Sequence, residues 1–248
     1  MDSLGLTSLL VLLSLITAAA VLYSSVGHGG ASGYIAAMAL FGLSAAFMKP
    51  AALIMNIAVS GLALFRLSRA GYFHWKLFFP FALGSVPAAY IGGACVITDT
   101  SYKYIVGVAL VIAAVRLFWE AEDRAAVNTP KLWISLPVGA GLGFVSGLTG
   151  VGGGIFLSPL LLFLRWTTMR TNAAIAAAFI LVNSIAGLLG HASIASHWPS
   201  GLPLLVGAAL LGALVGTELG VRRLAPVKLR QLLGVVLVIA ALKMLLTA

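Results

Sequence analysis

Two short glycine-rich stretches decide how this chain folds: Ser24–Gly33, which reads SSVGHGGASG, and Ser146–Gly154, which reads SGLTGVGGG. Each follows a long apolar run and precedes a short one. Glycine permits positive φ and close backbone approach. In lipid, such a broken backbone is tolerated only where it is buried in protein or lines a wet cavity. We therefore expect both stretches inside a folded membrane protein.

The composition around these stretches is that of an all-α integral membrane protein. Hydrophobic residues make up 61% of the 248 residues and charged residues only 8%, against about 25% charged residues in a soluble domain. The apolar runs are continuous, whereas a transmembrane barrel needs alternation. Basic loops that orient membrane proteins explain the net charge of +9, so no nucleic-acid partner is expected. With the single Cys95, no internal disulfide is possible.

Ten apolar segments can be read between charged, proline or glycine clusters. They cover approximately residues 5–26, 30–47, 50–67, 75–97, 102–119, 133–149, 153–165, 171–190, 200–221 and 229–247. As helices, Gly153–Leu164 would be about 18 Å long and Ala31–Phe47 about 25 Å, against a hydrocarbon core about 30 Å thick. Since each short segment follows a glycine stretch, we predict re-entrant helical hairpins. The alternative is two full spans in place of each hairpin, because both arrangements leave the connecting loops on the same sides of the membrane.

The two halves of the chain, residues 1–124 and 125–248, repeat each other. At an offset of 123, Gly27, Gly29 and Gly30 fall on Gly150, Gly152 and Gly153, and His74-Trp75 falls on His197-Trp198. The polar connector Glu120–Lys131 separates the halves. Each half holds five segments, an odd number, which predicts two inverted-topology repeats of the kind found in many transporters.

The basic residues support this inverted arrangement. With both termini outside, twelve of them fall in inner connectors: Arg66, Arg69, Lys76, Arg116, Arg124, Lys131, Arg165, Arg170, Arg222, Arg223, Lys228 and Arg230. Lys49, Lys103 and Lys243 remain outside. This positive-inside bias predicts a multi-pass protein of the cytoplasmic membrane with outer termini. Asp2 and the lack of a basic start indicate a retained first segment rather than a signal peptide.

A glycine loop before a helix is a potential anion site, because its backbone N–H groups and the helix dipole both favour negative charge. Inverted symmetry would bring the two loops together near the bilayer midplane. The candidate loop residues are Gly27, Gly29, Gly30, Gly150, Gly152, Gly153 and Gly154. The alternative is that these glycines only allow helices to pack closely.

Polar side chains near the breaks complete the candidate substrate-binding set. His28 could donate to an anion or carry a proton, or be a neutral histidine satisfied by backbone carbonyls. Asn56 and Asn183 could bind substrate or bridge helices. The nearby hydroxyls are Ser25, Ser32, Thr149 and Ser158. Glu218 is interpreted as an i, i+4 partner of Arg222, with a coupling carboxylate as the alternative.

The motif VGHGGASGY of the first half and the cluster TGVGGG, Thr149 to Gly154, resemble the sulfite exporter TauE/SafE family. The layout of two homologous halves with a charged connector is similar too, so the resemblance covers essentially the whole chain. It implies a multi-pass permease of the cytoplasmic membrane, linked to export of sulfite or organosulfonates. His28 is a departure from a plain glycine run.

The glycine loops and the repeat predict a secondary transporter of a small anion that works by alternating access. The resemblance implies that this anion is foremost a sulfur oxyanion or organosulfonate such as sulfite. Export is implied by the resemblance alone. No GxSxG, HExxH, Walker or CxxC motif occurs, so we expect neither an enzyme nor a cofactor. The expected partners are the anion and the lipid bilayer, and a homodimer is left open. The alternative is a channel-like facilitator of a small polar solute.

Overall fold

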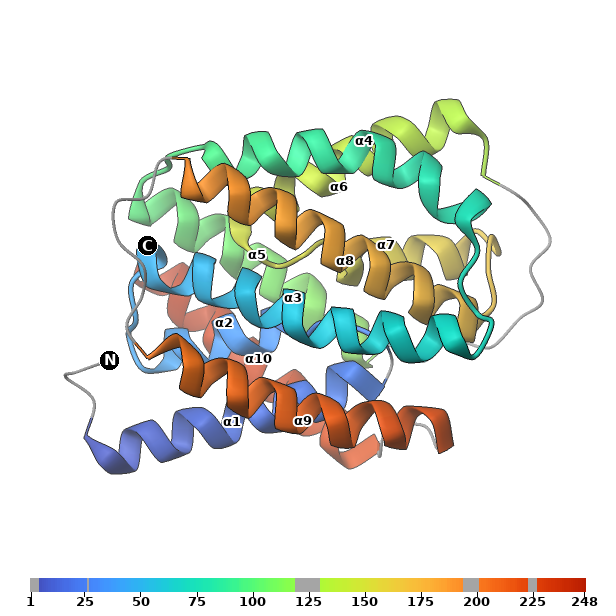
Figure 1. Ribbon diagram of the computed structural model, residues 1–248. Helices are drawn as coiled ribbons and strands as arrows, with labels where there is room; N and C mark the ends of the chain where they lie inside the picture. Colours follow the sequence, from blue (N-terminus) through green and yellow to red (C-terminus); the bar gives the residue numbers. More distant parts are fainter. Residues whose placement is uncertain (1–4, 26, 119–129, 194–200, 223–226) are drawn as a thin grey trace.

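The computed structural model describes residues 5–25, 27–118, 130–193, 201–222 and 227–248. These residues form ten α-helices that run roughly along one axis (Figure 1). In the first half they are α1 (Leu6–Ser25), α2 (Ala31–Leu40), α3 (Ala45–Arg69), α4 (Trp75–Ala94) and α5 (Asp99–Phe118). In the second half they are α6 (Leu132–Thr149), α7 (Gly154–Phe163), α8 (Met169–Ala192), α9 (Leu202–Arg222) and α10 (Val227–Leu246).

The helices follow the ten predicted segments, with one clear shift of a boundary. The sequence placed a break between residues 47 and 50, but α2 already ends at Leu40 and α3 begins at Ala45. Gly42, with φ +72°, lies in the turn between them. Pro50 therefore lies inside the early part of α3 rather than between helices.

Six helices among the described residues are long and apolar enough to cross a bilayer, namely α1, α3, α4, α6, α8 and α9. The helices α2 and α7 have 10 residues each, which gives about 15 Å of helix. Every residue of α2 from Ala31 to Ala39 is buried. The protein is thus a multi-pass membrane protein that encloses a short helix.

Stripes of small residues explain which helices pair. In α6, a Cβ added at Gly139, Gly143 or Gly147 would collide with the backbone of α4 at Phe81, Ser85 or Ala89. In α9, Gly212 and Gly216 lie in the same way against Thr17 and Val21 of α1. Such four-residue spacing lets helix backbones approach closely in membranes. Figure 1 shows the results: α4 and α6 lie along one side of the molecule, α1 and α9 along the opposite side, and α3 and α8 between them.

The two ends of the bundle differ in charge. The start of α1 and the end of α10 lie at the same end (Figure 1), here called the terminal end. There Lys103 donates to the Thr247 carbonyl and Lys243 to the Leu40 carbonyl, both at 2.9 Å. The opposite end, here called the Arg66 end, holds more basic side chains, namely Arg66, Arg69, Lys76, Arg165 and Arg170. There Arg170 donates to the Tyr72 hydroxyl.

Part of the predicted charge pattern lies outside the described side chains. This holds for Arg116, Arg124, Arg222, Arg223, Lys228 and Arg230, for the repeat boundary at 124–125 and for the His197-Trp198 pair.

Candidate functional site

The two glycine stretches meet at the side chain of Asn56. A Cβ added at Gly29 or at Gly152 would overlap the Asn56 amide, and in both cases would come within 2.9 Å of Ile180 Cγ2. Asn56 belongs to α3 and Ile180 to α8. The loops that precede α2 and α7, which are 123 residues apart, therefore converge on one place between α3 and α8.

The backbone of both loops has the conformation that favours glycine. Positive φ values occur at Gly27, Gly30, Gly150, Gly152 and Gly153. Gly30 and Gly153 are the N-cap residues of α2 and α7, and neither helix start has a side-chain cap in the described structure. The first N–H groups of a helix have no intrahelical partner. Two helix N-termini with positive dipole ends thus adjoin the Asn56 side chain.

Two buried amides near these loops have unusual hydrogen bonding. The Asn56 Nδ2 atom lies 3.4 Å from the Val151 carbonyl and 3.4 Å from Ser184 Oγ, while its Oδ1 atom has no partner among the described residues. The Asn183 side chain is completely buried, and neither of its polar atoms has a partner there. Buried polar groups are normally paired, so these amides require an explanation.

His28 links the two halves of the chain. Its side chain is 5% exposed, and its Nε2 atom lies 2.8 Å from the Ser158 hydroxyl of α7. Its backbone N–H donates to the Tyr23 carbonyl at 2.8 Å. The sequence suggested either an anion ligand or a histidine held by backbone carbonyls; the structure pairs the ring with a serine hydroxyl of the other half.

Tyrosine hydroxyls anchor the loops. Tyr34 donates to the Gly29 carbonyl at 2.7 Å, and Tyr102 to the Thr149 carbonyl at 3.0 Å. The Ser32 hydroxyl lies 2.6 Å from the Tyr23 hydroxyl. These aromatic residues were not among the sequence candidates, because a tyrosine in an apolar segment is also typical of ordinary packing.

The remaining candidate side chains bond locally or lie at the edge of the site. The Thr149 hydroxyl donates to the Val145 carbonyl and accepts from the Val151 N–H. The Ser25 hydroxyl donates to the Leu22 carbonyl within α1. Gly154 begins α7, where a Cβ would collide with Ile180.

Lys49 lies in a different place from the one that the sequence predicted. The sequence predicts an outer connector at this position, but Lys49 belongs to α3 and is 6% exposed. Its Nζ atom donates to the Gly93 carbonyl at 2.9 Å, with the Gly92 carbonyl at 3.4 Å. The available signal was its position directly before Pro50 in an apolar run, which gave no reason to expect burial.

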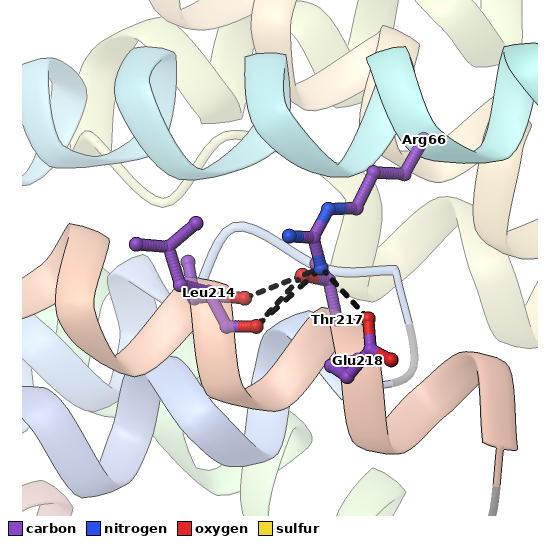
Figure 2. A network of polar contacts seen from close by, with 5 residues as sticks. Arg66, Leu214, Thr217 and Glu218 are labelled. Carbon is purple, nitrogen blue, oxygen red and sulfur yellow. Dashed lines mark hydrogen bonds and ion pairs between the residues drawn. The ribbon is translucent and has the colours of Figure 1, made fainter.

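Glu218 has a partner that the sequence analysis did not name. Arg66 of α3 lies 3.7 Å from the Glu218 carboxylate of α9 and donates to the Thr217 hydroxyl and the Leu214 carbonyl (Figure 2). The pair therefore joins two helices at the Arg66 end. The side chain of Arg222, the partner predicted from sequence, lies outside the described residues.

A groove of about 460 Å³ lies elsewhere, between α5, α6 and α7. Its lining is Tyr104, Ile105, Val108, Ala109, Ile112, Leu142, Val145 and Phe156, and contains none of the candidate site residues. Such an apolar surface suits lipid tails and not an anion. Within the described residues, no group of three or more His, Cys, Asp or Glu side chains could hold a metal ion.

Known proteins are similar to this chain over most of its length. The model of the family described as sulfite exporter TauE/SafE matches residues 12–244. The probable membrane transporter protein y4hK of Sinorhizobium fredii is 38% identical over 231 residues, which are 91% of this chain and 94% of that protein. The probable membrane transporter protein MJ0441 of Methanocaldococcus jannaschii is 27% identical over 134 residues, 52% of this chain and 50% of that protein. No solved structure matches the chain.

The resemblance found in the glycine motifs is confirmed by a family match that spans nearly all ten helices. The apolar helices and the transporter relatives agree on the type of protein. The chain is a multi-pass membrane permease that belongs to the sulfite exporter TauE/SafE family.

Proposed function

We propose that this permease is a secondary transporter of a small anion, bound between the N-termini of α2 and α7 near the bilayer midplane. The observation that carries the proposal is the convergence of both glycine loops on Asn56. Uncapped helix starts favour an anion through free N–H groups and the dipole. Such a site needs no lysine or arginine at its centre, in keeping with the uncharged residues around Asn56.

The buried amides support the same site. The buried Asn183 Nδ2 donor has no partner within the described structure, and the Asn56 Nδ2 donor makes only two long contacts of 3.4 Å. An oxyanion accepts several hydrogen bonds at once, and bonds to a charged acceptor are stronger than neutral ones. These amides would add donors to the backbone N–H groups and select anions by shape.

We further infer that the two halves are inverted repeats that exchange conformations during transport. The repeat relates α1 to α6, α3 to α8 and α4 to α9. The helix pair α4–α6 is therefore equivalent to α9–α1, and the pair α4–α8 is equivalent to α9–α3. The loop contacts are equivalent as well: Gly27 lies against Ala173 of α8, and Gly150 lies against Lys49 of α3. In transporters of this type, one repeat rocks against the other around a fixed central site.

The preferred substrate is a sulfur oxyanion or an organosulfonate such as sulfite, exported across the cytoplasmic membrane. Family membership and the donor-rich, uncharged centre support this class. The concentration of basic residues at the Arg66 end supports its placement in the cytoplasm, with the termini outside.

The first experiment measures anion binding to the purified protein as thermal stabilisation. Sulfite, sulfate, thiosulfate, sulfoacetate and taurine are titrated separately, because a ligand that binds the folded state raises apparent stability with concentration. A saturable shift with a sulfur anion is expected. If none of the five gives a saturable shift, the proposed substrate class is wrong.

Two variants then test the location of the site. Asn56→Asp keeps the shape of the side chain but places negative charge between the loops, and Gly152→Ala puts a methyl group against the Asn56 amide. Both should weaken binding by at least about tenfold, which corresponds to 1.4 kcal/mol. Gly61→Ala on α3 is the control, because its nearest neighbour is 3.9 Å away. Wild-type affinity in both site variants would place the anion elsewhere.

Counterflow in proteoliposomes separates the carrier from the facilitator. A carrier that alternates between two states shows faster uptake when the opposite side is loaded with substrate. Linear, non-saturating uptake without this stimulation would favour a channel-like facilitator.

A further inference from the structure

Lys49 is a buried cation whose described contacts are carbonyl groups of the chain. Its Nζ atom contacts the Gly93 and Gly92 carbonyls at 2.9 and 3.4 Å, near the last turn of α4. An ammonium group has three N–H donors. Two are directed at these carbonyls, which leaves one donor for another acceptor.

The charge of Lys49 is only partly balanced. Among the described residues, the ion pairs are Arg66–Glu218 and Lys103–Asp99, so no described carboxylate pairs with Lys49. The C-terminal end of a helix supplies about half a negative charge. A full positive charge buried beside it keeps a residual positive potential, which would attract an anion.

A second polar group faces the same end of the bundle. The Nδ1 atom of His191, near the end of α8, is buried and has no partner among the described residues. The ends of α4 and α8 are in close contact, since a Cβ on Gly190 would collide with Tyr90 and one on Gly93 with Gly187. Lys49 and the last turns of α8 thus meet the same end of α4, Lys49 through the Gly92 and Gly93 carbonyls and α8 through Gly187 and Gly190.

Lys49 also lies between the central loops and the terminal end of α3. It is seven residues before Asn56 on α3, so both occupy the same face two turns apart, at about 10 Å along the helix axis. Its backbone lies against the start of the second glycine loop, where a Cβ on Gly150 would come within 3.0 Å of the Lys49 carbonyl oxygen.

We propose that the Lys49 ammonium and the His191 ring form a second anion site at the terminal end, through which the substrate passes between the central loops and that side of the membrane. This site rests on the proposed anion transport. At the repeat offset of 123, Lys49 corresponds to Asn172. The two equivalent positions would therefore differ chemically, with the cationic Lys49 toward the terminal end and the neutral amide of Asn172 toward the Arg66 end.

Sided transport tests this site directly. Lys49→Met is compared, in vesicles of known orientation, with Lys49→Arg and with Lys103→Met. Lys103 is a lysine at the same end whose side chain is 30% exposed. Lys49→Met should raise the half-saturating concentration of sulfoacetate about tenfold from the terminal side, because a hydrogen bond to a charged group is lost. For the same variant, the half-saturating concentration measured from the Arg66 side should stay within about twofold of the wild-type value. Lys49→Arg should restore most of the affinity, and Lys103→Met should change neither side.

Labelling of the wild-type protein gives a second test that needs no variant. Sulfosuccinimidyl acetate, an anionic lysine reagent, is added from the terminal side, and acetylation of Lys49 and Lys103 is followed by mass spectrometry. Lys49 should react more slowly than Lys103, and sulfoacetate should slow its reaction alone.

The outcomes separate this site from the central one. If the wild type transports no sulfur anion, the proposed function fails. If the wild type transports an anion but Lys49 is never labelled, or if Lys49→Met lowers only the melting temperature without changing the half-saturating concentration, Lys49 merely caps α4 and the second site is wrong.

Discussion

Gly29 and Gly152 show how a single residue type can decide a site. At each, a side chain would overlap Asn56 and crowd Ile180, and Gly152 also has φ +86°. The repeat of the glycines was visible in the sequence. Their common contact, Asn56, was a candidate only as a polar residue at membrane depth, because nothing in the sequence shows that a residue of α3 lies between two loops 123 residues apart.

The hydrogen bond between His28 and Ser158 allows a prediction at the same scale. Removing either side chain leaves the other without this partner. The effects of His28→Ala and Ser158→Ala on the free energy of unfolding should therefore not be additive. We expect a coupling on the order of 1 kcal/mol in a double-mutant cycle on unfolding in detergent. A cycle of His28→Ala with Ser135→Ala, whose hydroxyl bonds the Lys131 carbonyl of its own helix turn, should be additive. Additivity in both cycles would refute the link.

At the scale of helices, the glycine stripe on α6 is the main reason that α4 and α6 pack together. Gly143 and Gly141 lie on the same helix, but a Cβ at Gly143 would collide with Ser85 whereas one at Gly141 meets nothing within 4 Å. Gly143→Ala should destabilise the protein by about 1–3 kcal/mol through overpacking. Gly141→Ala should be neutral or slightly stabilising, since alanine has the higher helix propensity. Equal melting temperatures for the two variants would argue against this packing.

For the whole molecule, the segregation of charge predicts how the bundle sits in the membrane. In a Cys95→Ser background, a cysteine at Lys243 should react with an impermeant maleimide on intact cells, because the terminal end is expected outside. A cysteine at Arg69 should react only after permeabilisation. The background variant, without either cysteine, should stay unlabelled. The reverse pattern of labelling would place the termini in the cytoplasm.

The number and rough position of the ten helices could be predicted from the sequence, because continuous apolar runs and their breaks depend on local composition. The glycine stretches and the family could be identified for the same reason. Local pattern was insufficient at the break near residue 47, where Pro50 resembled a terminator but tolerates a place early in α3. It also failed for Lys49, since a charged residue at the edge of an apolar run resembles a loop lysine.

Only the tertiary structure decided which polar groups meet. The pairing of His28 with Ser158, of Arg66 with Glu218, and of both loops with Asn56 joins residues more than a hundred positions apart or in different helices. These contacts depend on how α3 and α8 are enclosed by the outer pairs α4–α6 and α1–α9. Sequence alone determines that this chain is a helical membrane permease with two glycine breaks, because hydropathy and backbone freedom are local properties. The arrangement of its interior follows from close packing between distant segments, which no local pattern specifies.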